Sequence, residues 1–176
     1  MRSWRQVFII GFLLLIATIA FLLFFPFTET IAFYQEDREE LLAFLPIQDD
    51  NSFQIQYTHS IHLTDVVETY ELRNKEIVQT ELQFENFAIG MPSNVEGNEK
   101  FVEKDGKYLI KNMNRRFPYI DLRVGLVRAD HRVIYKESVY KLSNYIRPGT
   151  WVRIKPAKLS YWERLKGVEI SEQRKI

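Results

Sequence analysis

Residues 53–72 read FQIQYTHSIHLTDVVETYEL, and the spacing of their apolar side chains decides the fold. Odd-numbered apolar residues from Phe53 to Tyr57 alternate with polar ones, and an even-numbered set follows from Val66 to Leu72. A period of two is typical of a half-buried β-strand, whereas a helix repeats every 3.6 residues. The stretch therefore predicts two antiparallel strands joined as a hairpin.

Similar segments follow this pair along the chain, and we expect strands over residues 78–84, 101–102, 108–110, 120–126, 132–135 and 151–154. Asp105-Gly106 is a strong signal for a hairpin turn, because both residues tolerate positive φ. A short helix is predicted over residues 138–146. Many short strands at close spacing favour an all-β fold, an antiparallel β-sandwich or barrel-like domain over residues 52–156.

The N-terminus carries a different signal, because residues 7–25 contain no charge. As a helix they would span roughly 28 Å, close to the hydrocarbon thickness of a bilayer. Residues 1–27 therefore predict one transmembrane helix, an anchor or uncleaved signal. Arg2 and Arg5 keep the N-terminus in the cytoplasm and leave the following domain extracytoplasmic. The alternative is a signal peptide cleaved near Ala32, which would secrete the domain.

Two segments flank the predicted β-domain. Residues 28–51 are interpreted as a connector with a short helix over 36–44, which Pro46 ends. Residues 157–176 form a polar C-terminal tail, predicted to be mobile or helical. This tail interleaves basic residues with Tyr161 and Trp162, and contact with anionic lipid is one interpretation of it.

Composition excludes several classes of protein. The chain has no cysteine, so it has neither a disulfide framework nor a lipoprotein anchor. Its 24 Lys and Arg balance 23 Asp and Glu, which argues against a nucleic-acid-binding protein. We predict no cofactor.

One pair of residues has unusual chemistry for its predicted position. If the first hairpin turns over Leu63-Thr64, His59 lies opposite Glu68 on the apolar face. Burial disfavours a charge on either side chain alone, whereas the attraction between a charged histidine and a charged glutamate favours the charged form of both. The pair is interpreted either as a polar binding site or as a structural pair that fixes the strand register. Ser60 points to the other face of a strand, so we assign no catalytic residue.

A metal site and an anion site are two further possibilities. His59 and His62 point opposite ways on a strand, and zinc needs three or four converging ligands, so no metal site is predicted. Gly90 and Pro92 belong to a loop whose backbone amides can bind an anion, and Arg116 can pair with a carboxylate. An ordinary turn and a solvated surface are the alternatives. The candidate ligand-binding residues are His59, Ser60, Glu68, Gly90, Pro92 and Arg116.

Several motifs together resemble a known family. They are THSIH (58–62), the Glu in VVETYEL (66–72), IGMP (89–92), RRFPYIDLRVG (115–125) and PGTWVRIK (148–155). This combination is similar to the bacterial family catalogued as domain of unknown function 1850, over residues 53–155. The family's Thr-His-Ser and following Glu match Thr58, His59, Ser60 and Glu68, and its Gly-x-Pro loop matches Gly90 and Pro92.

The resemblance implies a role but no reaction. Genes of this family often lie beside tripartite ATP-independent periplasmic (TRAP) transporters with a TAXI solute receptor, which move organic acids. We therefore expect a membrane-anchored extracytoplasmic accessory or ligand-binding domain of such a transporter. Its expected partners are the membrane through residues 7–25, transporter subunits and a small organic acid, with no nucleic acid. The alternatives are an envelope hydrolase using His59 and Glu68, and a structural envelope assembly protein.

Overall fold

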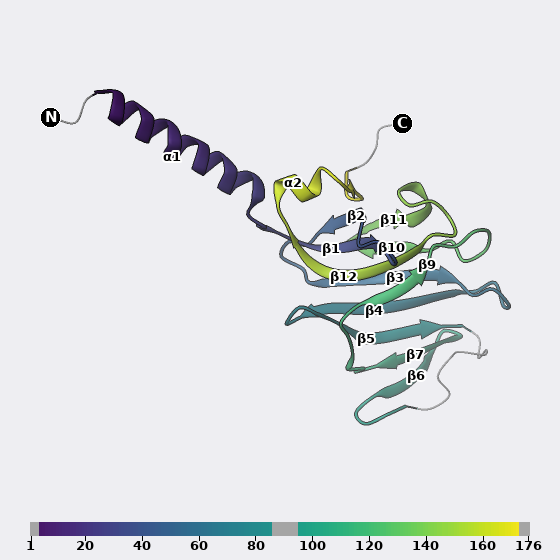
Figure 1. Cartoon of the computed structure of the whole chain (residues 1–176). Helices are drawn as coiled ribbons and strands as arrows, with labels where there is room; N and C mark the ends of the chain where they lie inside the picture. The colour runs from purple at the N-terminus through teal and green to yellow at the C-terminus, as the bar shows by residue number, and fades with distance from the viewer. Residues whose placement is uncertain (1–3, 86–94, 173–176) are drawn as a thin grey trace.

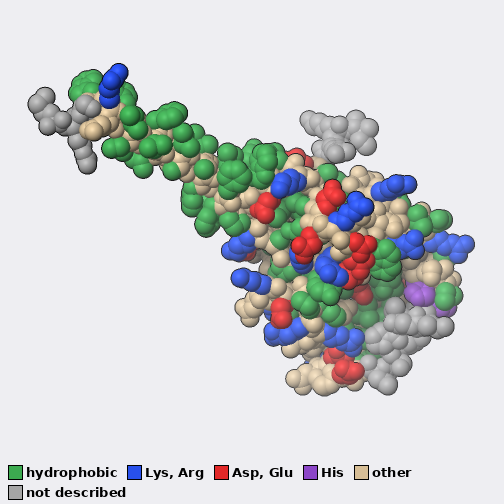
Figure 2. All heavy atoms as spheres, in the orientation of Figure 1, with side chains coloured by type: hydrophobic (Ala, Val, Ile, Leu, Met, Phe, Trp, Pro, Cys, Tyr) green, Lys and Arg blue, Asp and Glu red, His purple; other side chains and the backbone are tan. Residues whose placement is uncertain are grey.

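The computed structural model describes residues 4–85 and 95–172. Helix α1 (Trp4–Phe24) projects from a domain of two packed β-sheets (Figure 1). Within the described residues, α1 is the one helix long and apolar enough to cross a membrane, and none of it is buried. Figure 2 shows hydrophobic side chains along its length. The predicted apolar helix is confirmed, while its topology and cleavage stay predictions.

The first sheet has five strands in the order β13-β2-β1-β12-β9. Its strands are β1 (Thr28–Gln35), β2 (Leu41–Pro46), β9 (Ile120–Arg123), β12 (Trp151–Leu159) and β13 (Val168–Glu169). The long pairing of β1 with β12 is antiparallel and places Thr28 opposite Leu159. The short β13 runs parallel to β2.

The second sheet has eight strands in the order β11-β10-β3-β4-β5-β7-β6, with β8 also paired to β5. Its strands are β3 (Ser52–Thr58), β4 (Asp65–Arg73), β5 (Glu76–Phe84), β6 (Lys100–Lys104), β7 (Lys107–Lys111), β8 (Arg115–Phe117), β10 (Arg132–Tyr135) and β11 (Ser138–Lys141). The main core lies between the sheets, where Phe33 and Ile154 of the first pack with Phe53 and Ile55 of the second. The predicted all-β, largely antiparallel sandwich is confirmed.

The segment interpreted as a connector is instead part of this sandwich. Residues 36–44 form a turn and the start of β2, so the predicted helix is wrong. Residues 41–45 are too short an apolar run for a stable helix, and as a strand they bury Ala43 and Leu45 completely. Phe33 of β1 is also fully buried. The packed domain therefore begins directly after α1.

The segment predicted to be a mobile or helical tail is packed against the domain, and it contains a short helix. After β12, α2 (Tyr161–Arg164) begins with a capping box, in which the Ser160 hydroxyl accepts from the Glu163 backbone and the Glu163 carboxylate accepts from the Ser160 backbone. The chain then returns to the first sheet through β13, and Ile170 is fully buried. Residues 157–172 of the predicted tail therefore belong to the fold.

Local turn chemistry was predicted more accurately. Asp105 and Gly106 have φ of +53° and +74° and join β6 to β7, as expected for a two-residue hairpin turn. Residues 138–146 contain β11 and a single 3₁₀ turn (Leu142–Asn144) rather than the expected helix. Ser138 to Lys141 pair with β10, and this pairing replaces helical hydrogen bonds.

Candidate functional site

The hairpin of β3 and β4 has a different register from the one predicted. Ile55 lies opposite Glu68, and Tyr57 lies opposite Val66. The predicted faces are correct, because Phe53 and Ile55 are buried with Val66. His59, however, lies beyond the end of β3 and does not face Glu68. Leu-Thr is a poor two-residue turn, so the strands end earlier and residues 59–64 form a longer loop.

The loop after β3 holds both histidines of the THSIH motif. It closes through two backbone hydrogen bonds, from His59 N–H to the Thr64 carbonyl and from Leu63 N–H to the His59 carbonyl. The His59 ring stacks on His62, with 5.7 Å between ring centroids. Ser60 is exposed beside them. The two imidazoles therefore lie side by side instead of on opposite faces of a strand.

Glu68 itself is a carboxyl group within the inner face of the larger sheet. It lies in a cross-strand row with Ile55 on β3 and Leu82 on β5. The Tyr70 hydroxyl donates a hydrogen bond of 2.8 Å to its Oε2. Burial raises the pKa of Glu68, and the Tyr70 bond opposes that rise in part. Glu68 therefore holds a proton more tightly than a solvated glutamate.

Tyr57 connects Glu68 to a third histidine. It is the diagonal neighbour of Glu68 across the β3–β4 ladder. Burial, and then the charge of Glu68, raise the pKa of Tyr57, so its phenol stays protonated. On its other side its ring lies 5.7 Å from the ring of His131. Tyr57, Glu68, Tyr70 and His131 together are called the inner polar cluster below.

His131 enters this cluster from the connection between β9 and β10. Its Nδ1 accepts a hydrogen bond of 3.0 Å from the Gly125 backbone, which places the proton of the neutral ring on Nε2. Burial lowers the pKa of His131, and the charge of Asp130 opposes this only in part. The sequence alone does not place His131 beside Tyr57, because only the pairing of β3 with β10 brings the two residues together.

Two loops border the inner polar cluster and expose large apolar side chains. They are residues 59–64 and 124–131, called the distal loops below. Thr58, the last residue of β3, donates a backbone hydrogen bond of 2.8 Å to the Ala129 carbonyl, which holds the start of the first loop beside the second. Four of their large apolar side chains are more than half exposed: Ile61, Leu63, Leu126 and Val127. Figure 2 shows histidine side chains on the side of the domain opposite α1.

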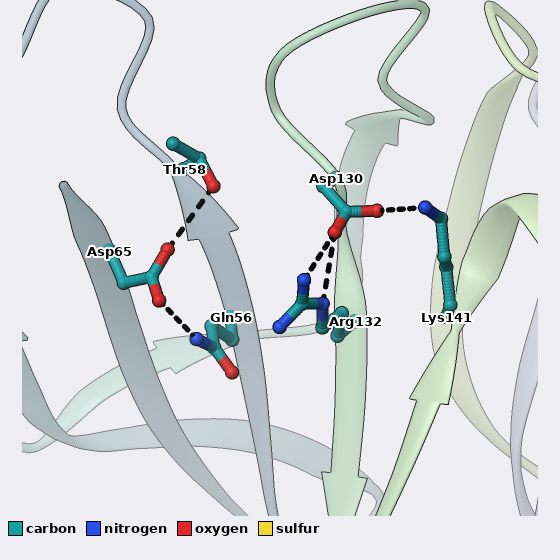
Figure 3. A network of polar contacts seen from close by, with 6 residues as sticks. All are labelled: Gln56, Thr58, Asp65, Asp130, Arg132 and Lys141. Carbon is teal, nitrogen blue, oxygen red and sulfur yellow. Dashed lines mark hydrogen bonds and ion pairs between the residues drawn. The ribbon is translucent and has the colours of Figure 1, made fainter. Parts of the chain in front are cut away.

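Two carboxylates near these loops, those of Asp65 and Asp130, are already bound by other side chains. Figure 3 shows two polar networks, formed by Gln56, Thr58, Asp65, Asp130, Arg132 and Lys141. Asp65 accepts from Thr58 Oγ1 at 3.1 Å and from Gln56 Nε2 at 2.7 Å. Asp130 pairs with Lys141 and Arg132, which hold the pKa of its carboxyl below its usual range. Thr58, the first residue of the THSIH motif, thus tethers the loop that follows it.

The remaining predicted residues lie elsewhere. Arg116 lies opposite Val78 and forms an ion pair of 3.3 Å with Glu76. Its β8 neighbour Phe117 packs against the core, so Arg116 points to the outer face, away from Glu68. The predicted loop residues at positions 90 and 92 fall outside the described residues. Among residues 4–85 and 95–172, no three His, Asp or Glu side chains are grouped to hold a metal ion.

Comparison with known proteins gives one match. A family model described as "Domain of unknown function (DUF1850)" matches residues 53–142. The matched segment contains all of the inner polar cluster and both distal loops. No curated protein and no solved structure matches the chain.

Proposed function

This chain belongs to the DUF1850 family, and on that basis we propose that it is a membrane-anchored extracytoplasmic accessory domain of a TRAP-type transporter with a TAXI solute receptor. The family match confirms the resemblance of the sequence motifs. One observation carries the proposal: the distal loops expose four large apolar side chains beside a half-buried carboxyl and imidazole. Contiguous exposed apolar side chains mark surfaces that bind other molecules.

The position of β1 supports a retained anchor. Cleavage near Ala32 would cut within β1, between the residues that pair with β12 and β2. It would also remove Ile31, which is fully buried in the core. A domain without this strand segment would lose both packing and ladder hydrogen bonds. We therefore propose that residues 4–24 are a permanent anchor, and Arg2 and Arg5 support a cytoplasmic N-terminus.

The distal loops are suited to a partner in the extracytoplasmic space. They lie at the opposite side of the domain from α1, so a solute receptor that approaches from outside meets them first (Figure 1). Their apolar side chains supply contact area, while the inner polar cluster supplies hydrogen-bonding groups that select the partner. His59 and Ser60 belong to the same surface.

The inner polar cluster also suggests how a small organic acid would bind. Two carboxylates in one poorly solvated site repel each other unless they share a proton. Glu68 holds its proton tightly because of burial, so it can donate a hydrogen bond to a ligand carboxylate. Tyr57 is a second donor. Binding of an organic acid through Glu68 would therefore weaken as the pH rises.

Site-specific crosslinking in cells tests the proposal. A photoreactive residue at Leu126 is expected to crosslink to a transporter subunit, whereas the same residue at Val139 is not. Val139 is a matched control, because it is also an exposed apolar residue but lies on β11. If Leu126 captures no transporter subunit and deletion of the gene leaves organic-acid uptake unchanged, the proposal is wrong.

The other two functions have less support from the geometry. The hydrolase interpretation needs Glu68 to orient His59, and the register separates these residues. A structural envelope protein would need the distal loops only for folding. Polar substitutions at Ile61 or Leu126 distinguish that possibility, because they would reduce uptake without reducing protein level if the loops bind a partner.

A further inference from the structure

We infer that the segment from Tyr161 to Leu165 is a second membrane contact, which rests in the lipid interface beside α1 and holds the domain in one orientation. The inference rests on the proposed function only in requiring that α1 spans the membrane. Its partner is the headgroup and upper acyl region of the leaflet from which α1 emerges.

The segment exposes an apolar surface with the composition of a membrane interface. Tyr161 is 56% exposed, Trp162 48% and Leu165 64%. Tryptophan and tyrosine are enriched where the bilayer meets water, since their rings are apolar and their N–H and O–H groups are polar. Phe25 and Phe27, which follow α1, are also exposed and extend this surface.

The position of Trp162 indicates how deep the segment lies in the membrane. Its ring lies 6.0 Å from the ring of Phe24, the last residue of α1. When α1 spans the bilayer, Phe24 marks the level at which the chain leaves the hydrocarbon. Trp162 then lies at the same level, and Figure 1 shows α2 beside the end of α1.

The segment is fixed to the domain, so its contact with lipid orients the whole sandwich. The capping box holds its first turn, and Arg164 forms an ion pair of 2.9 Å with Glu169 on β13. Beyond β13, Ile170 is fully buried. A domain held by both α1 and α2 cannot pivot freely about the anchor, and its distal loops stay turned away from the membrane.

The nearby charges are largely neutralised. Lys158 pairs with Glu29 at 2.8 Å, Arg164 pairs with Glu169, and the charge of Lys166 acts on the nearby Glu163 carboxylate. Attraction to anionic lipid therefore contributes little, and we expect the aromatic and apolar side chains to carry the contact. The contact should persist in membranes of purely zwitterionic lipid.

The three tryptophans of the chain provide the test. Full-length variants with a single tryptophan are placed in zwitterionic vesicles that contain brominated lipid, which quenches fluorescence only at short range. W4F/W151F keeps Trp162, W151F/W162F keeps Trp4, and W4F/W162F keeps Trp151. Trp151 is the matched control, because it is 49% exposed and begins β12, whereas Trp162 follows the end of that strand.

Trp162 is expected to be quenched at least about threefold more strongly than Trp151, as an interfacial tryptophan should be. Quenching of Trp4 with equal, weak quenching of Trp162 and Trp151 would overturn the inference and leave the anchor intact. Weak quenching of all three would instead contradict the anchor itself.

A second labelling experiment covers the case in which a tryptophan variant does not fold. Since the chain has no cysteine, Leu165→Cys and Val127→Cys each accept a single spin label. The label at Leu165 should be accessible to lipid-soluble oxygen, and the label at Val127 to a water-soluble quencher. Equal accessibility of the two labels to the water-soluble quencher would overturn the inference.

Discussion

The Tyr70 hydroxyl donates a hydrogen bond of 2.8 Å to the Glu68 carboxylate, two residues earlier on the same face of β4. The same tyrosine ring stacks on Phe53, with 5.5 Å between centroids. Glu68 is thus held by a side chain that belongs to the apolar core. This arrangement links the chemistry of the candidate site to the stability of the sandwich.

Glu68→Gln should change how stability depends on pH. The pKa of Glu68 is raised from its ordinary value of 4.5, so the folded state disfavours the charged form. The wild type is then relatively more stable below the ordinary pKa and loses that stability as the pH rises through the folded pKa. The glutamine variant lacks this loss. Its melting temperature relative to wild type should therefore rise from about pH 4 to about pH 8.

The comparison is made by thermal unfolding of both proteins at each pH. Glu172→Gln, at an exposed position, is the control and should follow the wild type at every pH. A constant difference between Glu68→Gln and wild type across the range would show that Glu68 has the same pKa in both states.

Tyr70→Phe should destabilise the protein by about 1–2 kcal/mol, because it removes the hydrogen bond that the Tyr70 hydroxyl donates to Glu68 on the inner face of the sheet. In a Glu68→Leu background the same change should cost much less. Denaturant unfolding of the four proteins gives a double-mutant cycle, and a coupling energy of at least about 0.5 kcal/mol is expected. Additive effects would mean that the bond contributes nothing to stability.

His131→Phe should cost about 1–3 kcal/mol at about pH 8, because it leaves the Gly125 N–H without its acceptor. Burial lowers the pKa of His131 from its ordinary value of 6.5, so its contribution to stability is present above that value and is lost as the pH falls through the folded pKa. The gap between variant and wild type should therefore narrow in acid. Unfolding curves recorded at about pH 8 and in acid measure this difference in stability. A difference that widens in acid would contradict a lowered pKa for His131.

Ile170→Ala tests the packing of the C-terminal segment. Truncation of a fully buried isoleucine should cost about 2–5 kcal/mol, whereas a residue in a mobile tail would have no effect. Glu172→Ala, two residues later and exposed, is the control. Equal melting temperatures for the two variants would show that this segment does not pack in solution.

Features that depend on neighbouring residues could be predicted from the sequence. The apolar helix follows from a long uncharged run, and the faces of β3 and β4 follow from the alternation of Phe53 and Ile55 with glutamines. The hairpin at Asp105-Gly106 follows from two residues that tolerate positive φ. In each case the physical cause lies within a few residues of the chain.

The tertiary structure decided which strands join the core and which polar groups meet. Residues 41–46 become β2 because β1 offers a partner edge, and β1 in turn depends on β12, far away in the sequence. One change of register separates His59 from Glu68, and strand pairing brings His131 to Tyr57 instead. The sequence alone determined the apolar N-terminal helix, the β class and the placement of Glu68 on the inner face. The residues that surround Glu68 were decided by strand pairing between distant segments. The register of that pairing depends on the packing of the whole sandwich.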